Sequence, residues 1–375
     1  MFSIQEYLKD LTYLCSIDSG NRNAEGTKAM AAFFKERYEA LGLKTEIRYY
    51  NDNDFAPFLL ARNSDSETID VLFVAHMDTV FPVGHGKDRP LTVDADNIGR
   101  GPGIIDCKGG CLLVENLLKE MRNADGTWKF NFAVAYNSDE ERGSKFSRAY
   151  FEELAQKSRY CFVFEPGRAN DEFVSVRKGG ANYILHCHGI VAHSGVEPEK
   201  GASAILELSK WVSELYELVD YAAGTTLNIG RFDGGGDNGA VPDYAECTLS
   251  FRYLDPKALE SLKEKLAYMQ EHRFDMRTTI EVEQVSLRPA MIIHPATAHL
   301  IDELEAAGKE TDQPIQHLTT GGGSDGNFVS PYGVATLDGC GPCGANLHTV
   351  NEYLKVGSVE ERLVLMQTLL NRLFK

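Results

Sequence analysis

The stretches VLFVAHMD (71–78), FNFAVAYNSDEE (130–141) and YCFVFE (160–165) share one pattern that predicts the fold of this chain. Each begins as a short apolar run, of the kind that forms a strand buried on both faces, and each ends in imidazole or carboxylate side chains. Helical patterns separate the strands, and this alternation is typical of a largely parallel sheet. Functional crevices lie beyond the carboxyl ends of such strands, so we expect these polar side chains to converge on a metal.

Apolar periodicity predicts the other elements of the chain. In the first half, the expected helices are at 3–16, 24–42, 108–122 and 144–157, around strands at 71–75, 130–136 and 160–164. From about residue 178 the pattern becomes strand, helix, two strands, helix and strand, at 182–191, 202–220, 225–232, 244–254, 256–272 and 277–287. This β-α-β-β-α-β order matches a ferredoxin-like unit of four antiparallel strands under two helices. Helical patterns then follow at 297–308 and 358–374.

The change of pattern predicts a small domain inserted into a larger α/β domain. We expect the larger domain at 1–177 and 290–375 and the inserted α+β lid domain at 178–289. Gly179-Gly180 and Pro289 lie near the two crossings and are expected to act as hinges. Gly234 to Gly236 are expected to form a turn between two lid strands.

Length and composition limit what the chain does. At 375 residues, of which 43% are apolar, it is long enough for two cores. The formal net charge of -17 argues against a nucleic-acid or anionic-membrane partner, because both require a basic surface. No stretch approaches the ~18 apolar residues of a membrane span, and charged residues interrupt the N-terminal segment where a signal peptide is apolar. We therefore expect a cytoplasmic protein.

The eight cysteines are expected to be free thiols, because the chain is long and carries no secretory signal. Cys340 and Cys343 form a C-x-x-C pair, which elsewhere is a redox centre or half of a structural zinc site. Here the pair lies in a glycine-rich stretch without a second C-x-x-C. A plain loop is the favoured interpretation.

Two local patterns offer metal chemistry. His76 and Asp78 are two residues apart at a strand end, which places both side chains on the same side. A carboxylate beside a ligating histidine fixes its tautomer, so His76 suits the metal and Asp78 a supporting position. Of the adjacent residues Glu140 and Glu141, one can act as a metal ligand and its neighbour as a general base.

Each candidate also has an ordinary structural explanation. In isolation, Asp106 in GPGIIDCKGG (101–110) is better explained as a helix cap, and Glu140 and Glu141 as acidic residues that favour the dipole of the next helix. Glu165 suits an ion pair as well as a ligand. Taken together, however, the candidates form a set of five ligands that offers nitrogen and oxygen atoms but no thiolate. Such a set favours two catalytic zinc ions about 3.5 to 4 Å apart with a shared carboxylate. The set is His76, Asp106, Glu141, Glu165 and His348.

Seven motifs in sequence order then carry a family resemblance. They are HMDTVFP (76–82), GPGIIDCKGG (101–110), NSDEERGS (137–144), FEP (164–166), AHSG (192–195), TGGGSD (320–325) and LHTVNEY (347–353). Together they resemble the di-zinc exopeptidase family that includes glutamate carboxypeptidase, aminoacylase, acetylornithine deacetylase and peptidase T. The resemblance covers nearly the whole chain. GPGIIDCKGG, NSDEERGS and RPA (288–290) are most similar to the folate-cleaving glutamate carboxypeptidase branch.

The resemblance implies a role for each candidate residue. One zinc would be held by His76, Asp106 and Glu165, and the other by Asp106, Glu141 and His348. Asp106 would be the bridge. Glu140 would be the general base and acid, and Asp78 would support His76.

The lid residues are also assigned by resemblance. His193 matches the histidine that polarises the scissile carbonyl, which in dimeric members comes from the partner subunit. Arg252, on the polar face of a lid strand, and Arg288 match arginines that bind a substrate carboxylate. The family usually has asparagine two residues before the Val-Pro pair of its lid, where this chain has Gly239. Asn238 takes that role only if the loop realigns by one residue.

These observations predict a zinc-dependent carboxypeptidase-like enzyme with two zinc ions per subunit, a small peptide or N-acyl amino acid substrate, and a homodimer formed through the lid. An N-acyl amino acid deacylase and a tripeptide aminopeptidase are the alternatives within the family. A metal-binding protein without turnover is the alternative from another class. The presence of Glu140 argues against that last alternative, because a binding site has no need of a base.

Overall fold

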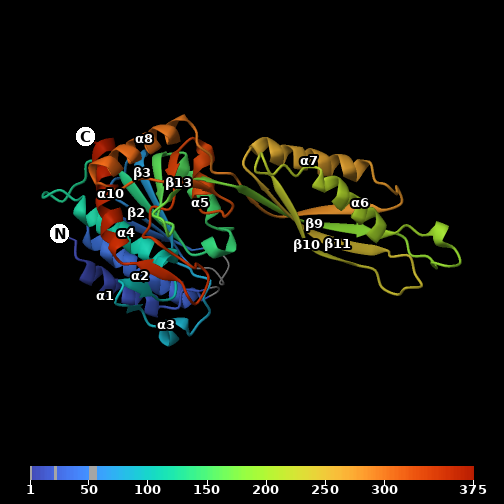
Figure 1. The fold of residues 1–375 in the computed structure, drawn as a ribbon, viewed down its shortest axis with the longest axis horizontal. Helices are drawn as coiled ribbons and strands as arrows, with labels where there is room; N and C mark the ends of the chain where they lie inside the picture. The colour runs from blue at the N-terminus through green and yellow to red at the C-terminus, as the bar shows by residue number, and fades with distance from the viewer. Residues whose placement is uncertain (1, 21–22, 50–56) are drawn as a thin grey trace. The chain divides into compact units, whose positions relative to one another are not determined.

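The computed structural model describes residues 2–20, 23–49 and 57–375, and the chain divides into two compact units (Figure 1). Unit 1 comprises Met1–Val176, Met291–Thr320 and Ser324–Lys375, and unit 2 comprises Arg177–Ala290 and Gly321–Gly323. The expected insertion covered 178–289. The assignment of Gly321–Gly323 to unit 2 has no counterpart in the sequence pattern.

A six-stranded sheet forms the centre of unit 1 (Figure 1). Its order is β1 (Lys44–Arg48), β2 (Phe58–Arg62), β6 (Phe132–Asn137), β3 (Ile69–His76), β7 (Ser158–Val163) and β14 (Ala335–Leu337). The β6–β3, β3–β7 and β7–β14 pairs are parallel, whereas β1–β2 and β2–β6 are antiparallel. The sheet is mixed and largely parallel, which confirms the predicted fold class.

Both faces of this sheet are buried, because alternate residues of each strand enter two different cores. Val71 and Phe73 of β3 enter one core, and Leu72 and Val74 enter the other. The first core is covered by α1 (Ile4–Ser16), α2 (Ala24–Ala40), α4 (Gly110–Glu120), α8 (Pro295–Glu310) and α10 (Gly357–Leu373). The second is covered by α5 (Arg148–Ala155) and α9 (Gly326–Val329).

Two small sheets and several short turns complete unit 1. One sheet has the order β15 (Gly344–Ala345), β16 (Tyr353–Lys355), β5 (Ile98–Arg100) and β4 (Thr92–Val93). A second pairs β13 (His317–Thr320) with β8 (Phe173–Arg177). Short turns are α3 (His85–Asp88), η1 (Ile104–Gly109), η2 (Glu140–Arg142) and η4 (Ser330–Tyr332). Pairing of β16 with β5 brings the chain that follows His348 beside the chain that leads to Asp106.

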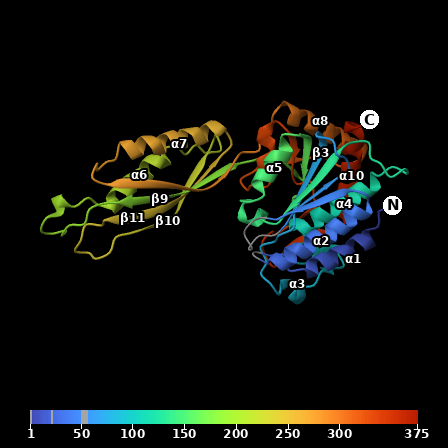
Figure 2. The same ribbon diagram turned by 180° about the vertical axis from the view of Figure 1, so that it is seen from behind.

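Unit 2 is a four-stranded antiparallel sheet with two helices on one face, seen from both sides in Figures 1 and 2. The strand order is β10 (Thr226–Gly234), β11 (Tyr244–Tyr253), β9 (Gly179–His188) and β12 (Thr279–Arg288). The helices are α6 (Ala204–Tyr216) and α7 (Pro256–Glu271), and the short turn η3 (Pro198–Lys200) precedes α6. Chain order and strand order are those of the expected ferredoxin-like unit.

Two local predictions were wrong. The helix expected at 144–157 begins only at Arg148, because Ser144 has a positive φ of 55° that a helix does not allow. Gly234 is the last residue of β10, not part of a turn. The expected hinge residues Gly179 and Gly180 are the first two residues of β9, and a Cβ on Gly179 would stand 2.4 Å from the Tyr253 ring.

Among the described residues, no helix combines the length and the apolar character that a membrane crossing requires.

Candidate metal centre

The parallel strands deliver polar residues to one edge of the central sheet. His76 is the last residue of β3 and lies opposite Asn137, the last residue of β6. Glu165 follows the end of β7 by two residues. Because these strands are neighbours and run in the same direction, side chains far apart in sequence come together.

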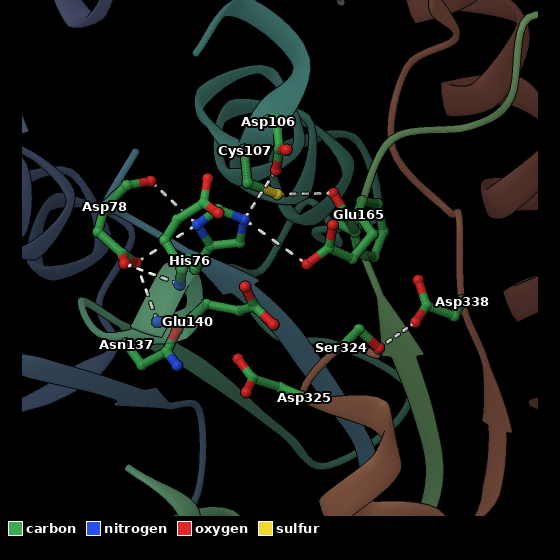
Figure 3. Close-up of polar contacts among 12 residues, drawn as sticks. His76, Asp78, Asp106, Cys107, Asn137, Glu140, Glu165, Ser324, Asp325 and Asp338 are labelled. Atoms are coloured by element: carbon green, nitrogen blue, oxygen red, sulfur yellow. Dashed lines mark hydrogen bonds and ion pairs between the residues drawn. The ribbon is translucent and has the colours of Figure 1, made fainter. Parts of the chain in front are cut away.

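The His76 ring lies between Asp78 on one side and Asp106 and Glu165 on the other (Figure 3). Its Nδ1 atom is 3.0 Å from the Asp78 carbonyl oxygen and 3.4 Å from Asp78 Oδ1. Its Nε2 atom is 2.9 Å from Asp106 Oδ1 and 3.6 Å from Glu165 Oε1. Burial acts to lower the pKa of His76, but the hydrogen bonds with Asp106 and Asp78 outweigh it and hold the pKa well above its usual value.

Asp106 is shared by two histidines. It lies in η1, where its own backbone departs from helical geometry (φ -114°, ψ 85°). Its Oδ1 atom faces His76, and its Oδ2 atom is 3.2 Å from Nε2 of His348. Burial acts to raise the pKa of Asp106, but the hydrogen bonds with His348 and His76 outweigh it and bring the pKa below its usual range. Each carboxylate oxygen therefore faces a different imidazole, which is the arrangement of a bridging ligand.

Glu141 and His348 form the second side of the cluster, with Nε2 of His348 3.2 Å from Glu141 Oε2. Hydrogen bonds with Asp106 and Glu141 raise the pKa of His348 to about 10, and burial raises the pKa of Glu141 to about 7. Glu141 Oε1 is buried and has no hydrogen-bond partner among the described residues. A buried carboxylate oxygen without a donor is costly unless a cation lies beside it, so these residues fit a metal ion.

Proximity alone leaves two overlapping ligand sets. Single ligand atoms of His76, Glu140 and Glu165 lie within 4.8 Å of one another, and so do atoms of His76, Asp106 and Glu141. The first set makes Glu140 a candidate ligand as well as a candidate base. The closest contacts instead group His76 with Asp106 and Glu165, at 2.9 and 3.6 Å, and separately His348 with Asp106 and Glu141, both at 3.2 Å. We favour this second grouping, because close contacts between ligand atoms define a site better than looser proximity does.

Asp78 links the histidine to the paired glutamates. Besides its contact with His76 Nδ1, its Oδ1 accepts the Glu140 amide at 3.2 Å and its Oδ2 accepts the Glu141 amide at 3.0 Å. Asp78 is 4% exposed, so this contact set is shielded from water. One carboxylate thus orients His76 and fixes the backbone that carries Glu140 and Glu141.

The structural roles considered for these acidic residues, a helix cap for Asp106 and a favourable dipole interaction for Glu140 and Glu141, are wrong. The N-cap of α4 is Gly109 and the N-cap of α5 is Ser147, and neither makes a side-chain cap hydrogen bond. The acidic residues instead enter the cluster, because η1 and η2 separate them from the helices that follow.

Sequence reasoning missed residues that support the cluster through the backbone. Buried Ser144 donates a short hydrogen bond to Asp325, and its amide binds the Asp139 carbonyl at 2.8 Å, which closes the turn that carries Glu140. Glu352 accepts three backbone amides of the Asp106 turn. Asp325 and Glu352 stand in two of the motifs quoted above, TGGGSD and LHTVNEY. That position is the only signal of their supporting role that the sequence offers.

Unit 2 holds the remaining candidates. His193 is exposed, and its Nδ1 accepts the Gly195 amide at 3.1 Å. The Ser194 hydroxyl donates to the Asn238 carbonyl at 3.4 Å, so the His193 loop and the Asn238 loop are neighbours. Arg252 and Arg288 lie opposite Gly180 on its two neighbouring strands.

All eight cysteines are buried free thiols. Burial raises the pKa of Cys340 well above its usual value and also raises that of Cys343, which disfavours the reactive thiolate. Two thiols near the centre have a structural use: Cys107 donates to the Phe164 carbonyl at 3.0 Å, and Cys111 to the His76 carbonyl at 3.2 Å.

Two histidines that share a buried aspartate can hold a pair of metal ions, an arrangement that occurs in metal-dependent hydrolases. The chain belongs to peptidase family M20/M25/M40, whose sequence model matches residues 72–372. This confirms the family resemblance that the motifs indicate. The chain is a hydrolase of a metallopeptidase family, which implies a bound metal.

Individual relatives carry different names. Carboxypeptidase G2 of Pseudomonas sp. (strain RS-16) is 26% identical over 371 residues, which cover 97% of this chain and 88% of that protein. Succinyl-diaminopimelate desuccinylase of Psychrobacter sp. (strain PRwf-1) is 27% identical over 369 residues, covering 90% and 89%. The crystal structure of aminopeptidase PepT from Bacillus cereus ATCC 10987 has a TM-score of 0.80 at 20% identity and covers 100% of this chain and 99% of that one. The structural likeness concerns the fold.

Asp106 and Asp78 predict different metal losses. Asp106→Ala removes the carboxylate that both histidines share, so both metal positions should empty or scramble. Asp78→Ala leaves every proposed ligand in place and should cost only about 10-fold to 100-fold in affinity. Metal content per chain, measured after dialysis, checks this. Equal loss in the two variants would mean that Asp78 is itself a ligand.

Proposed function

We propose that the chain is a zinc-dependent exopeptidase that hydrolyses an amide bond next to a free C-terminal carboxylate. Family membership supports hydrolysis of a peptide-like bond at a metal centre. The observation that carries the substrate choice is the environment of Arg252, which is partly buried beside a second cation. A substrate carboxylate is the natural counter-ion for such a group.

The glycine between the two arginines makes this environment possible. A Cβ atom on Gly180 would stand 1.9 Å from Nη1 of Arg252, so the guanidinium lies close over the glycine backbone. Burial and the charge of Arg288 lower the pKa of Arg252. Arg252 forms no ion pair with any residue that the structure describes. A planar guanidinium in this setting matches a carboxylate in both charge and shape.

Zinc suits the ligand set, because histidine nitrogen and carboxylate oxygen are its usual ligands at catalytic centres. We assign His76, Asp106 and Glu165 to one ion. Asp106, Glu141 and His348 would hold the other. When bound, zinc supplies a Lewis acid that polarises the substrate carbonyl and lowers the pKa of water.

Glu140 and His193 supply the remaining chemistry in this proposal. Glu140 removes a proton from the attacking water and returns it to the leaving amine. His193 donates a hydrogen bond to the oxygen on which negative charge develops. The Gly195 amide occupies Nδ1 of His193, so the neutral ring carries its proton on Nε2 and presents a donor there.

The family alternatives differ on the amino side of the scissile bond. An N-acyl amino acid deacylase removes an acyl group, whereas a tripeptide aminopeptidase requires a free amine. One relative is named as a carboxypeptidase and another as a desuccinylase, so the names do not distinguish among these activities. Substrate tests do distinguish them. N-blocked dipeptides, N-acyl amino acids and free-amine tripeptides, compared on zinc-loaded protein, separate the three activities.

Arg252 should control recognition of the substrate carboxylate. Arg252→Ala should raise KM for an N-blocked dipeptide about 10-fold to 100-fold, the loss of a hydrogen bond to a charged group, and leave turnover of its C-terminal amide unchanged. Arg231→Ala is the matched control, because Arg231 lies on the same sheet but pairs with Asp233 and Glu246. Equal losses on the acid and the amide would contradict the proposal.

Glu140→Gln distinguishes a base from a ligand. If Glu140 moves the proton, this variant should bind both metal ions and lose on the order of 10²-fold to 10⁴-fold in kcat. Metal content and kcat are measured on the same preparation. A variant that loses a metal ion would place Glu140 in the ligand set, and near-normal turnover with full metal would remove its catalytic role.

We also propose a homodimer formed through unit 2, in which His193 serves the partner's centre. Inactive His193→Ala mixed with inactive Glu140→Gln should then regain activity, because a heterodimer has one site with an intact base and an intact histidine. Random exchange gives about a quarter of wild-type activity for independent sites in a closed dimer. Mass analysis verifies exchange. Verified exchange without activity, or a monomer by light scattering, would refute the trans arrangement.

A further inference from the structure

Glu352 is a buried carboxylate with an unusual set of partners. Its Oε1 accepts the amides of Ile105 and Asp106, at 3.0 and 3.1 Å, and its Oε2 accepts the amide of Gly103 at 3.0 Å. The residue is 1% exposed. These contacts join residues that are 246 to 249 positions apart in the sequence.

The Asp106 turn needs this acceptor because its own backbone is irregular. Asp106 and Cys107 both have non-helical φ and ψ, and Gly103 has a φ of 67°. A Cβ on Gly103 would stand 2.5 Å from the Thr79 side chain, so only glycine fits at this point of the turn. Buried amides that no strand or regular helix satisfies must find another acceptor, and Glu352 provides one for three of them.

Glu352 is also tied to the loop that carries His348. Its own amide donates to the Thr349 carbonyl at 3.2 Å, and the Thr349 amide to the Asn346 carbonyl at 3.3 Å. The His348 side chain is 55% exposed and has a backbone φ of 62°, so neither burial nor a strand holds it in place. Immediately after Glu352 the chain enters β16, which pairs with β5.

We propose that Glu352 is a positioning residue that sets the spacing between Asp106 and His348 before metal binds. This rests on the metal centre of the proposed function. His76 and Glu165 stand at the ends of central strands and need no help from Glu352. The ion held by Asp106, Glu141 and His348 therefore depends on Glu352 more than the ion held by His76, Asp106 and Glu165. The two metal positions are unequal, because two of the three ligands of the first stand at the ends of central strands, whereas all three ligands of the second lie in short turns and a loop.

The test is zinc binding by Glu352→Gln, which keeps the size of the side chain but replaces one acceptor oxygen with a donor. Zinc per chain is measured over a range of chelator-buffered free zinc, without substrate. We expect one ion to bind nearly as in the wild type and the affinity for the second to fall about 10-fold to 100-fold. Wild-type affinity for both ions would overturn the proposal, and so would equal weakening of both.

Glu207→Gln is the matched control. Glu207 is 2% exposed and also accepts three donors, the Phe274 amide at 2.9 Å, the Asp275 amide at 2.8 Å and Trp211 Nε1 at 3.1 Å. It lies in unit 2, outside the cluster of ligands. Glu207→Gln likewise places an amide group where buried donors need an acceptor, and it should leave both zinc affinities unchanged. A similar loss of zinc in this control would show that the effect is general destabilisation.

Hydrogen exchange of the metal-free wild-type protein decides the matter even if Glu352→Gln does not fold. The amides of Gly103, Ile105 and Asp106 should exchange slowly both with and without zinc. Fast exchange that becomes slow only on zinc addition would mean that the metal forms the turn, which refutes the proposal. A wild-type protein that binds two zinc ions but hydrolyses no substrate would refute the proposed function and leave the role of Glu352 standing.

Discussion

The buried carboxylate of Asp106 constrains the rest of the structure. A carboxylate removed from water is costly unless both oxygens find positive or donor partners. In this protein each oxygen faces a histidine, and the two histidines come from opposite ends of the chain. Hydrogen bonds with the same carboxylate raise the pKa values of His76 and His348. Metal ligation requires neutral imidazole and ionised carboxylate, so metal binding by these residues depends on pH.

The layered sheet explains how such a cluster is kept in register. His76, Asn137 and Glu165 owe their positions to parallel strands buried on both faces, where a shift by one residue would turn every apolar side chain to the wrong core. Asp106 and His348 have no strand of their own and are placed by hydrogen bonds from other segments. His348 follows the whole of unit 2 in sequence, so the centre is complete only after both parts of unit 1 have come together.

The strand-borne part of this arrangement could be predicted from the sequence. The apolar runs before His76 and Glu165 are long enough to be recognised, and parallel packing then dictates where they end. The short strands β2 and β14 were missed, because five and three residues carry too little periodicity. Asp106 was ambiguous, because its helix-preceding position also suits a cap. The role of Glu352 could not be predicted beyond its place in the motif LHTVNEY, because its partners are backbone amides, which do not depend on residue identity.

The cluster of candidate metal ligands in unit 1 does not by itself explain which substrate is cleaved. Relatives named as a carboxypeptidase and as a desuccinylase are about equally similar to this chain, at 26% and 27% identity over most of its length. Activities that share a bond type but differ in the flanking groups need different contacts to those groups, since specificity is a difference between binding energies. In the proposed function this contact comes from the polar face of β11, where the Arg252 guanidinium lies over Gly180 and near Arg288. The proposal thus assigns recognition of the substrate carboxylate to the inserted unit, and bond cleavage to the residues at the end of the central sheet.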